Sequence, residues 1–110
     1  MAIILVKHNV KEYSTWRKVY DEHKAFRIKS GMQSEKVMRS TTDPNQMFLL
    51  FKWDNIMNAK IFTQSEDLKK VMQNAGVIGK PEMHFLEEAG QLTEKGQLTP
   101  PRSMIEPIQS

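Results

Sequence analysis

The sequence predicts an α+β fold in which two helical regions lie on one face of a four-stranded antiparallel sheet. Three observations support this prediction. Residues 2–10 are rich in β-branched side chains, as strands commonly are. Apolar side chains recur at helical spacings after this segment and again after residue 55. Between the two helical regions, the turn residues Asp43, Pro44 and Asn45 separate two segments of strand-like composition, which is typical of a hairpin.

The first strand and the first helix are predicted within residues 2–31. The run "AIILVKHNV" at 2–10 predicts the strand. In residues 12–31, side chains of one apolar face recur at spacings of three and four, namely Tyr13, Trp16, Val19, Tyr20, His23 and Phe26. Gly31 follows the last of them and predicts a left-handed C-terminal cap.

A hairpin is predicted from two strands, at 32–40 and 46–53. The first, "MQSEKVMRS", is rather polar, which favours a place at the edge of the sheet. The second sends Met47, Leu49, Phe51 and Trp53 to one face and Phe48 and Leu50 to the other.

The second helical region is predicted to consist of two segments with a break near Ser65. Asp54 or Asn55 can cap the first segment, Ser65 can cap the second, and Gly76 stops it. We interpret "VIGKP" (77–81) as a connector and 82–88 as the last strand. The order β-α-β-β-α-β then predicts a ferredoxin-like sandwich with both helical regions on one face of the sheet.

Length and composition set the class of protein. The chain has 110 residues, of which 39% are hydrophobic and 26% charged, and it has no cysteine. We predict one domain at residues 1–89 and a C-terminal tail at 90–110, which holds three of the five prolines. Without cysteine, disulfides and thiolate chemistry are excluded. The longest apolar runs have five residues, so we expect neither a membrane span nor a signal peptide, and we expect the cytoplasm as the compartment.

The net charge of +3 comes from basic residues that are interleaved with acidic ones. Such a mixture is typical of a solvated surface, and we expect no nucleic-acid binding.

The predicted sheet raises the question of what covers its second face. The segments 2–6 and 47–51 are apolar on both sides, but the helices cover one side. Soluble monomers rarely expose a large apolar patch, so we expect a homodimer with the two sheets face to face. An aspartate at Leu49 or Phe48, whichever faces the partner, is expected to break it. Apolar side chains of the tail are candidates to extend this interface: Met104, Ile105 and Ile108.

Three stretches of the sequence carry a resemblance to a known family. They are "VKHNVKEYSTWRKVYDEHKAFRIKSGMQSEKV", "DPNQMFLLFKWDN" and "AKIFTQSEDLKKVMQNAGVIGKPEMHFLEE", which together lie within residues 2–88. They resemble the dimeric α+β barrel superfamily and, within it, the small proteins grouped with antibiotic-biosynthesis monooxygenases. The resemblance implies a sheet-to-sheet dimer. The superfamily includes cofactor-independent quinone-forming oxygenases, haem-degrading enzymes and members without an assigned reaction, so the fold does not settle the activity.

His23 is the candidate catalytic residue. It lies on the apolar face of the first helix, between Tyr20 and Phe26, and an imidazole can exchange protons near neutral pH. The alternative is a structural histidine whose ring is tied to a backbone carbonyl or to a carboxylate such as Glu22.

Trp16, Tyr20 and Trp53 are candidates to bind an aromatic substrate, although aromatic side chains at helical spacing more often form core. Asn9 is a further candidate, because the haem-degrading members use an asparagine of the first strand. Those members also use a tryptophan and a histidine of the second helical region, and residues 56–75 contain neither. We therefore expect no haem and no other cofactor.

His8 and His84 lie on adjacent predicted strands but lack a metal-binding spacing, so cross-strand packing is expected and a metal site is not. His8 shares a face with Ile4 and Val6, whereas Asn9 shares one with Ile3 and Leu5.

Two functions remain open at this point. The first is a cofactor-independent monooxygenase that acts on a small, flat, oxygenated substrate in a pocket between helices and sheet. The second is a non-catalytic homodimer that binds a small apolar ligand or has a structural role.

Overall fold

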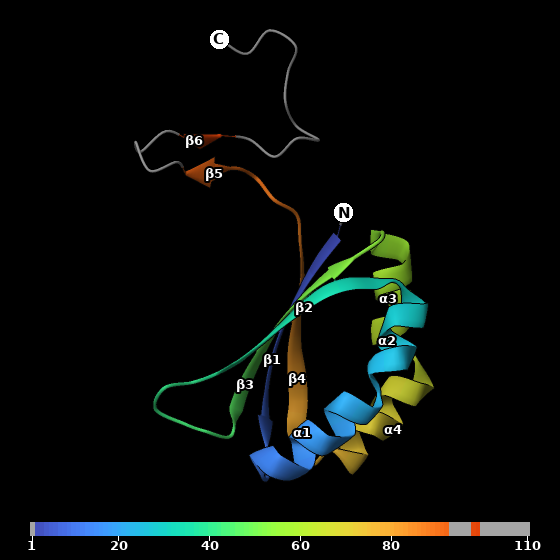
Figure 1. Ribbon diagram of the computed structural model, residues 1–110, viewed down its shortest axis with the longest axis vertical. Coiled ribbons are helices and arrows are strands. Elements are labelled where there is room, and N and C mark those ends of the chain that lie inside the picture. Colours follow the sequence, from blue (N-terminus) through green and yellow to red (C-terminus); the bar gives the residue numbers. More distant parts are fainter. Residues whose placement is uncertain (1, 93–97, 100–110) are drawn as a thin grey trace, which may run out of the picture.

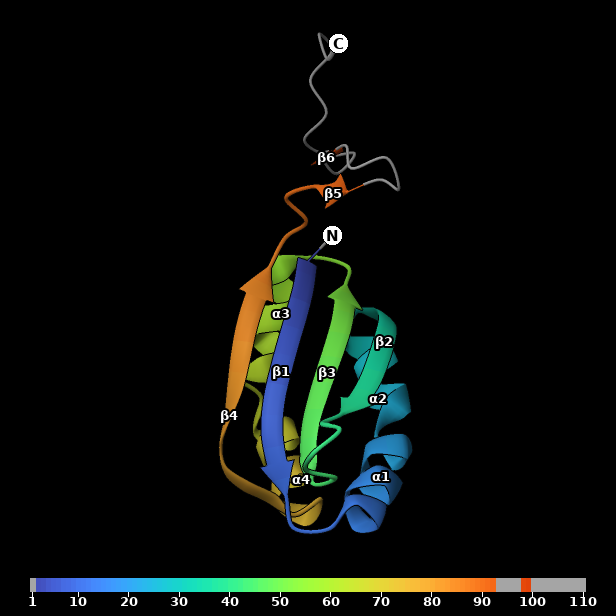
Figure 2. The same ribbon diagram turned by 90° about the vertical axis from the view of Figure 1, so that its left-hand side faces the viewer.

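The computed structural model describes residues 2–92 and 98–99, and its main body is a four-stranded antiparallel sheet with helices on one face (Figure 1). The strands are β1 (Ala2–Val10), β2 (Met32–Arg39), β3 (Gln46–Trp53) and β4 (Val77–Leu86). Their order in the sheet is β2-β3-β1-β4, which Figure 2 shows face-on. The ferredoxin-like topology is therefore confirmed, with β1 and β3 in the centre and the polar β2 at an edge.

The first predicted helix is divided into α1 (Tyr13–Glu22) and α2 (Lys24–Ser30). At His23 the backbone has φ −92° and ψ 5°, and its N–H lies 3.2 Å from the carbonyl oxygens of both Val19 and Tyr20. Such a shared hydrogen bond tightens the turn and changes the course of the chain, so the prediction of one continuous helix was wrong. Gly31 ends α2 with φ 126°, as predicted, and a Cβ atom there would lie 2.5 Å from the Asp54 side chain.

The second helical region consists of α3 (Ile56–Thr63) and α4 (Glu66–Asn74), with the predicted break at Ser65. Side chains cap both helices: the side-chain oxygen Oδ1 of Asn55 accepts from the Asn58 N–H at 2.8 Å, and Ser65 Oγ accepts from the Leu68 N–H at 3.2 Å. Helix α4 lies over the sheet but has no buried side chain. It is therefore the least tightly packed wall of the helical layer.

Strand β4 begins earlier than predicted. Residues 77–81 were interpreted as a connector, but they form the first half of the strand and pair with the end of β1. The pairing register shifts between Lys7 and Asn9, and Gly79 has φ 70°. An irregularity on an edge strand accommodates both this glycine and Pro81, and for that reason the composition of the segment looked like a loop.

The alternation along β3 separates the two predicted sets of side chains, and the structure shows which set the helices cover. Met47, Leu49, Phe51 and Trp53 point toward the helices and are at most 4% exposed. The opposite face carries a patch of apolar side chains, hereafter the open face: Ile3, Leu5, Met38, Phe48, Leu50, Ile78 and Leu86. Met38, Ile78 and Leu86 of this open face remain 39–50% exposed. The helices α1 to α4 all lie on the other side of the sheet (Figure 1).

After β4, a short ladder pairs β5 (Gln91–Leu92) with β6 (Leu98–Thr99). The tail residues Met104, Ile105 and Ile108 lie outside the described part of the chain, so their predicted role stays a prediction. In the described ranges, no helix has the length and apolar character needed to cross a membrane.

Candidate functional site

A small cavity of about 50 Å³ lies between the sheet and the helices. Its wall on the sheet side comes from β1, β3 and β4, and its wall on the helical side comes from α1, α2, α3 and α4. Most of the lining is apolar, and the side chains with polar atoms are Trp16, Tyr20, His8, His23, Arg27 and Thr63. A mostly apolar lining with a few polar side chains is typical of small-molecule sites, but this cavity is smaller than the roughly 300–1,000 Å³ that such sites usually have.

The structure brings three of the five predicted site residues together. Trp16, Tyr20 and His23 line the cavity, and the rings of Trp16 and Tyr20 are stacked with centroids 4.7 Å apart. Because all three come from one face of α1 and its C-terminal end, the helical spacing in the sequence was sufficient to group them.

The other two predicted residues do not line this cavity. Asn9 lies on the opposite face of β1, where its side-chain oxygen accepts a long hydrogen bond of 3.4 Å from Gln46. Trp53 is fully buried, and its indole N–H donates to the Ser30 carbonyl at 3.1 Å. In this place Trp53 packs the end of α2 against the sheet.

His8, for which the sequence predicted a packing role, lies in the cavity wall. It is 6% exposed, and neither ring nitrogen has a hydrogen-bond partner among the described residues. Burial lowers its pKa to about 4, so the imidazole is neutral at pH 7. The parity of β1 had grouped His8 with Ile4 and Val6, but the structure was needed to show that the helices cover this face and that His8 lacks a partner among the described residues.

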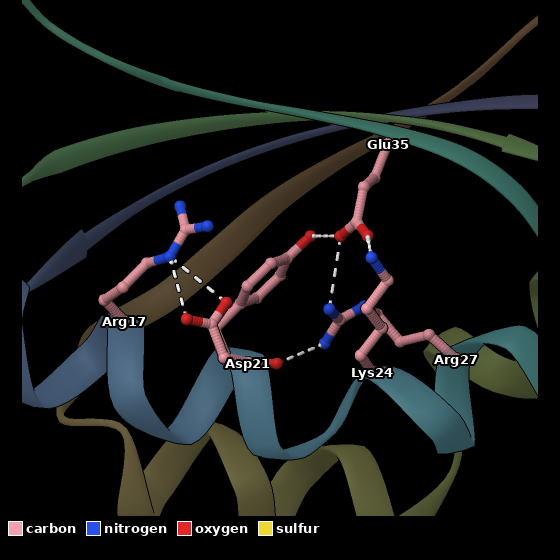
Figure 3. A network of polar contacts seen from close by, with 6 residues as sticks. Arg17, Asp21, Lys24, Arg27 and Glu35 are labelled. Carbon is pink, nitrogen blue, oxygen red and sulfur yellow. Dashed lines mark hydrogen bonds and ion pairs between the residues drawn. The ribbon is translucent and has the colours of Figure 1, made fainter.

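A polar network joins α1, α2 and β2 next to the cavity (Figure 3). The Arg27 guanidinium is 3% exposed, donates to the Tyr20 carbonyl at 2.7 Å and lies 3.2 Å from a carboxylate oxygen of Glu35. The Tyr20 hydroxyl donates to the same carboxylate, and Lys24 contacts its second oxygen at 3.5 Å. Two cations thus share one anion, which leaves a positive balance beside the cavity.

The pKa values in this region follow from burial and charge. Burial lowers the pKa of His23, and the positive charge of Arg27 lowers it further, against the opposing effect of Asp67. Burial and the hydrogen bond to Glu35 raise the pKa of Tyr20 above its usual range. Burial alone raises the pKa of Glu35, but the hydrogen bond from Tyr20 and the charges of Arg27 and Lys24 outweigh it, so this pKa is lowered. At neutral pH the cavity therefore has two neutral imidazoles and one cation.

Metal ligands do not converge in the described ranges: no group of three or more His, Asp or Glu side chains is placed to hold an ion there. His8 and His84 in particular point to opposite faces of the sheet, because His84 pairs with Leu5 on the open face.

Comparisons with known proteins give matches in structure but not in sequence. No family model matches the chain, and no curated protein matches it either. SnoaB of Streptomyces nogalater, a cofactor-independent oxygenase, has a TM-score of 0.70 at 12% identity, over 84% of this chain and 97% of SnoaB.

Two further solved structures have the same architecture. A protein of Bordetella bronchiseptica, proposed to be an antibiotic biosynthesis monooxygenase, has a TM-score of 0.69 at 15% identity, over 79% of this chain and 95% of its own. A conserved protein of Methanosarcina mazei has a TM-score of 0.63 at 16% identity, over 78% of this chain and 91% of its own. At such low sequence identities, structural similarity is evidence for a shared fold and not for a shared function. The chain shares the ferredoxin-like α+β fold of these solved structures.

Proposed function

We propose that the protein is a cofactor-independent monooxygenase that acts on a small, flat, hydroxylated aromatic molecule. The observation that carries this proposal is the apolar cavity between sheet and helices, which has neutral histidines in its wall and a cation beside it. A neutral imidazole can take a proton from a phenolic hydroxyl, and the positive charge of Arg27 favours the resulting anion. Residues 1–89 form the domain that carries this site, and 90–110 form an appended tail.

In this mechanism His23 is the general base, and molecular oxygen is the oxidant. With 1-naphthol as substrate, His23 takes the hydroxyl proton, and the electron-rich ring carbon opposite the hydroxyl forms a bond to O₂. The distal oxygen of the peroxide takes up the proton. The O–O bond then breaks as the hydrogen on the same carbon is lost, which yields 1,4-naphthoquinone and water. One oxygen atom enters the product and the other leaves as water, so one O₂ is consumed for each naphthol.

Entry of a ring requires the cavity to widen, because about 50 Å³ is the space of a few water-sized groups. Helix α4 is the wall of the cavity that can be displaced at the lowest cost in free energy. It contributes Leu68, Val71 and Met72 to the lining, yet none of its side chains is fully buried.

Replacing His23 by glutamine is expected to lower the rate of quinone formation at least about a hundredfold, since general base catalysis typically contributes a factor of that order or more. Oxygen uptake and quinone absorbance measure the rate, and ¹⁸O₂ shows where the oxygen goes. Lys18→Gln, an exposed change on α1, is the control. If the wild-type protein consumes no oxygen above the background oxidation of 1-naphthol or of other electron-rich phenols, the catalytic proposal is wrong.

The alternative function is a non-catalytic protein that binds the same kind of ligand. What favours it is the ring of His23, which stacks on Phe26 with centroids 4.8 Å apart and is thus partly committed to packing. Binding of 1-naphthol without oxygen uptake would identify this case.

We also propose that the open face forms the interface of a homodimer. Phe48 lies on this face, whereas Leu49 is 4% exposed and points toward the helices. Phe48→Asp is therefore the substitution expected to give a folded monomer, because it places a charge in an interface where burying each large apolar side chain is worth roughly 1.5–3 kcal/mol. Light scattering measures the mass and circular dichroism checks the fold. A Phe48→Asp variant that stays dimeric contradicts the sheet-to-sheet arrangement.

A further inference from the structure

His8 is a buried polar side chain that the proposed reaction does not use. It lies near the C-terminal end of the central strand β1, 6% exposed, and both ring nitrogens lack a partner among the described residues. A buried polar group without a hydrogen bond destabilises a fold, so such groups are uncommon in native proteins. A molecule bound in the cavity can supply the hydrogen-bond partner that the His8 ring lacks among the described residues.

Among the described residues, the neighbours of His8 form no hydrogen bond with its ring. Its ring meets Trp16 in an edge arrangement, with centroids 5.8 Å apart and planes at 72°. On the sheet side the cavity is lined by apolar side chains such as Ile4, Val6 and Met83. On the helical side, α4 contributes apolar side chains only. The side chains with polar atoms that face the cavity from other elements are Trp16, Tyr20, His23, Arg27 and Thr63, and no hydrogen bond joins His8 to any of them.

Water is a poor occupant of this position. A buried water needs two to four polar partners to replace the hydrogen bonds it loses, and around His8 the walls are mostly apolar. An aromatic ring with one hydroxyl fits better: its carbon atoms match the walls, and its oxygen can accept a hydrogen bond from the protonated imidazole nitrogen of His8, which leaves the hydroxyl proton for His23.

The charged side chains beside the cavity further restrict the class of ligand that can bind there. The positive balance of Arg27, Lys24 and Glu35 beside the cavity disfavours a cationic ligand. In the part of the chain that the structure describes, Arg27 also has an Nε–H group without a partner, and this residue lines the same cavity. A neutral hydroxyl that can become an anion suits both residues, because His8 can bond the hydroxyl and the guanidinium can stabilise negative charge.

We propose that His8 is the hydrogen-bonding residue that selects hydroxylated aromatic molecules over equally shaped rings without a hydroxyl. This inference rests on the proposed function, since it takes the same cavity as the ligand site. His8 then binds and orients the substrate from the sheet, while His23 acts on it from the helical side.

The test compares two probes of similar shape, phenol and fluorobenzene, whose binding is followed by Trp fluorescence and NMR titration. The ratio of their affinities is measured for the wild-type protein, for His8→Leu and for His8→Gln. We expect the preference for phenol to fall about three- to tenfold in His8→Leu, the factor that one hydrogen bond contributes, while the affinity for fluorobenzene stays the same. His8→Gln, which keeps a donor and an acceptor, is expected to retain most of the preference.

The ¹⁵N shifts of the His8 ring add a readout that packing alone would not move. They should change on addition of phenol and remain the same on addition of fluorobenzene. An unchanged phenol preference in His8→Leu, with fluorobenzene still bound, overturns the role of His8 and leaves the cavity site standing. Failure of both probes to bind the wild-type protein overturns the cavity as a ligand site, and with it the proposed function.

Discussion

Glu35→Leu is expected to lower the free energy of unfolding by about 3–5 kcal/mol, the usual cost of leaving a buried charge without its partner. The Arg27 guanidinium is 3% exposed, and Glu35 is the carboxylate that it contacts, at 3.2 Å. The substitution also removes the acceptor of the Tyr20 hydroxyl. Urea unfolding followed by fluorescence measures the change.

Asp21→Asn is the matched control for this variant. It breaks the ion pair between Arg17 and Asp21, which is of similar length at 3.1 Å but exposed on both sides, so it should cost less than about 1 kcal/mol. The double variant Arg27→Met with Glu35→Leu should recover much of the lost stability, because no charge is then left unpaired. Equal costs for Glu35→Leu and Asp21→Asn would show that Arg27 is not held by Glu35.

The stability of the wild-type protein is expected to fall by about 3 kcal/mol more than that of His8→Leu as the pH is lowered from about 6.5 to 4. The pKa of His8 is lowered from 6.5 to about 4 in the folded protein because the ring is buried. Within this window the unfolded chain binds a proton at His8 and the folded chain does not. Lowering the pH therefore favours unfolding. Above pH 6.5, protonation of His8 in the unfolded chain no longer lowers the free energy of unfolding.

The comparison with His8→Leu isolates this effect, because His23, whose pKa is also lowered, contributes equally to both proteins. Urea unfolding at a series of pH values gives the two stability curves. His8→Leu should also be the more stable protein at pH 7, since leucine removes two buried nitrogens without partners. Parallel curves for the two proteins would mean that His8 gains a proton in the folded state as easily as in the unfolded one.

The fold was predictable because its signals are local. The β-branched run of β1, the turn at Asp43 to Asn45 and the caps at Asn55 and Ser65 each depend on a few neighbouring residues. Two boundaries were missed for the opposite reason. The break at His23 and the early start of β4 depend on how the chain packs against the sheet, and the glycine and proline of residues 77–81 suggested a loop.

The site was predictable only in part. Helical spacing grouped Trp16, Tyr20 and His23, and strand parity placed His8 and Asn9 on opposite faces. Sequence alone gave no means to see that His8 lacks a partner or that Arg27 pairs with Glu35, since both facts depend on contacts between elements that are distant along the chain. The indole N–H of Trp53 likewise finds its acceptor, the Ser30 carbonyl, through tertiary packing.

The proposed function requires the cavity between sheet and helices to bind a small hydroxylated aromatic molecule. Its most direct test is an NMR structure analysis of the protein with 1-naphthol, in which nuclear Overhauser contacts locate the ring. We expect contacts from the naphthol protons to Trp16 and His8, and to the Met72 methyl group of α4. Contacts confined to open-face side chains such as Leu5 and Phe48, or no contacts at all, would contradict it.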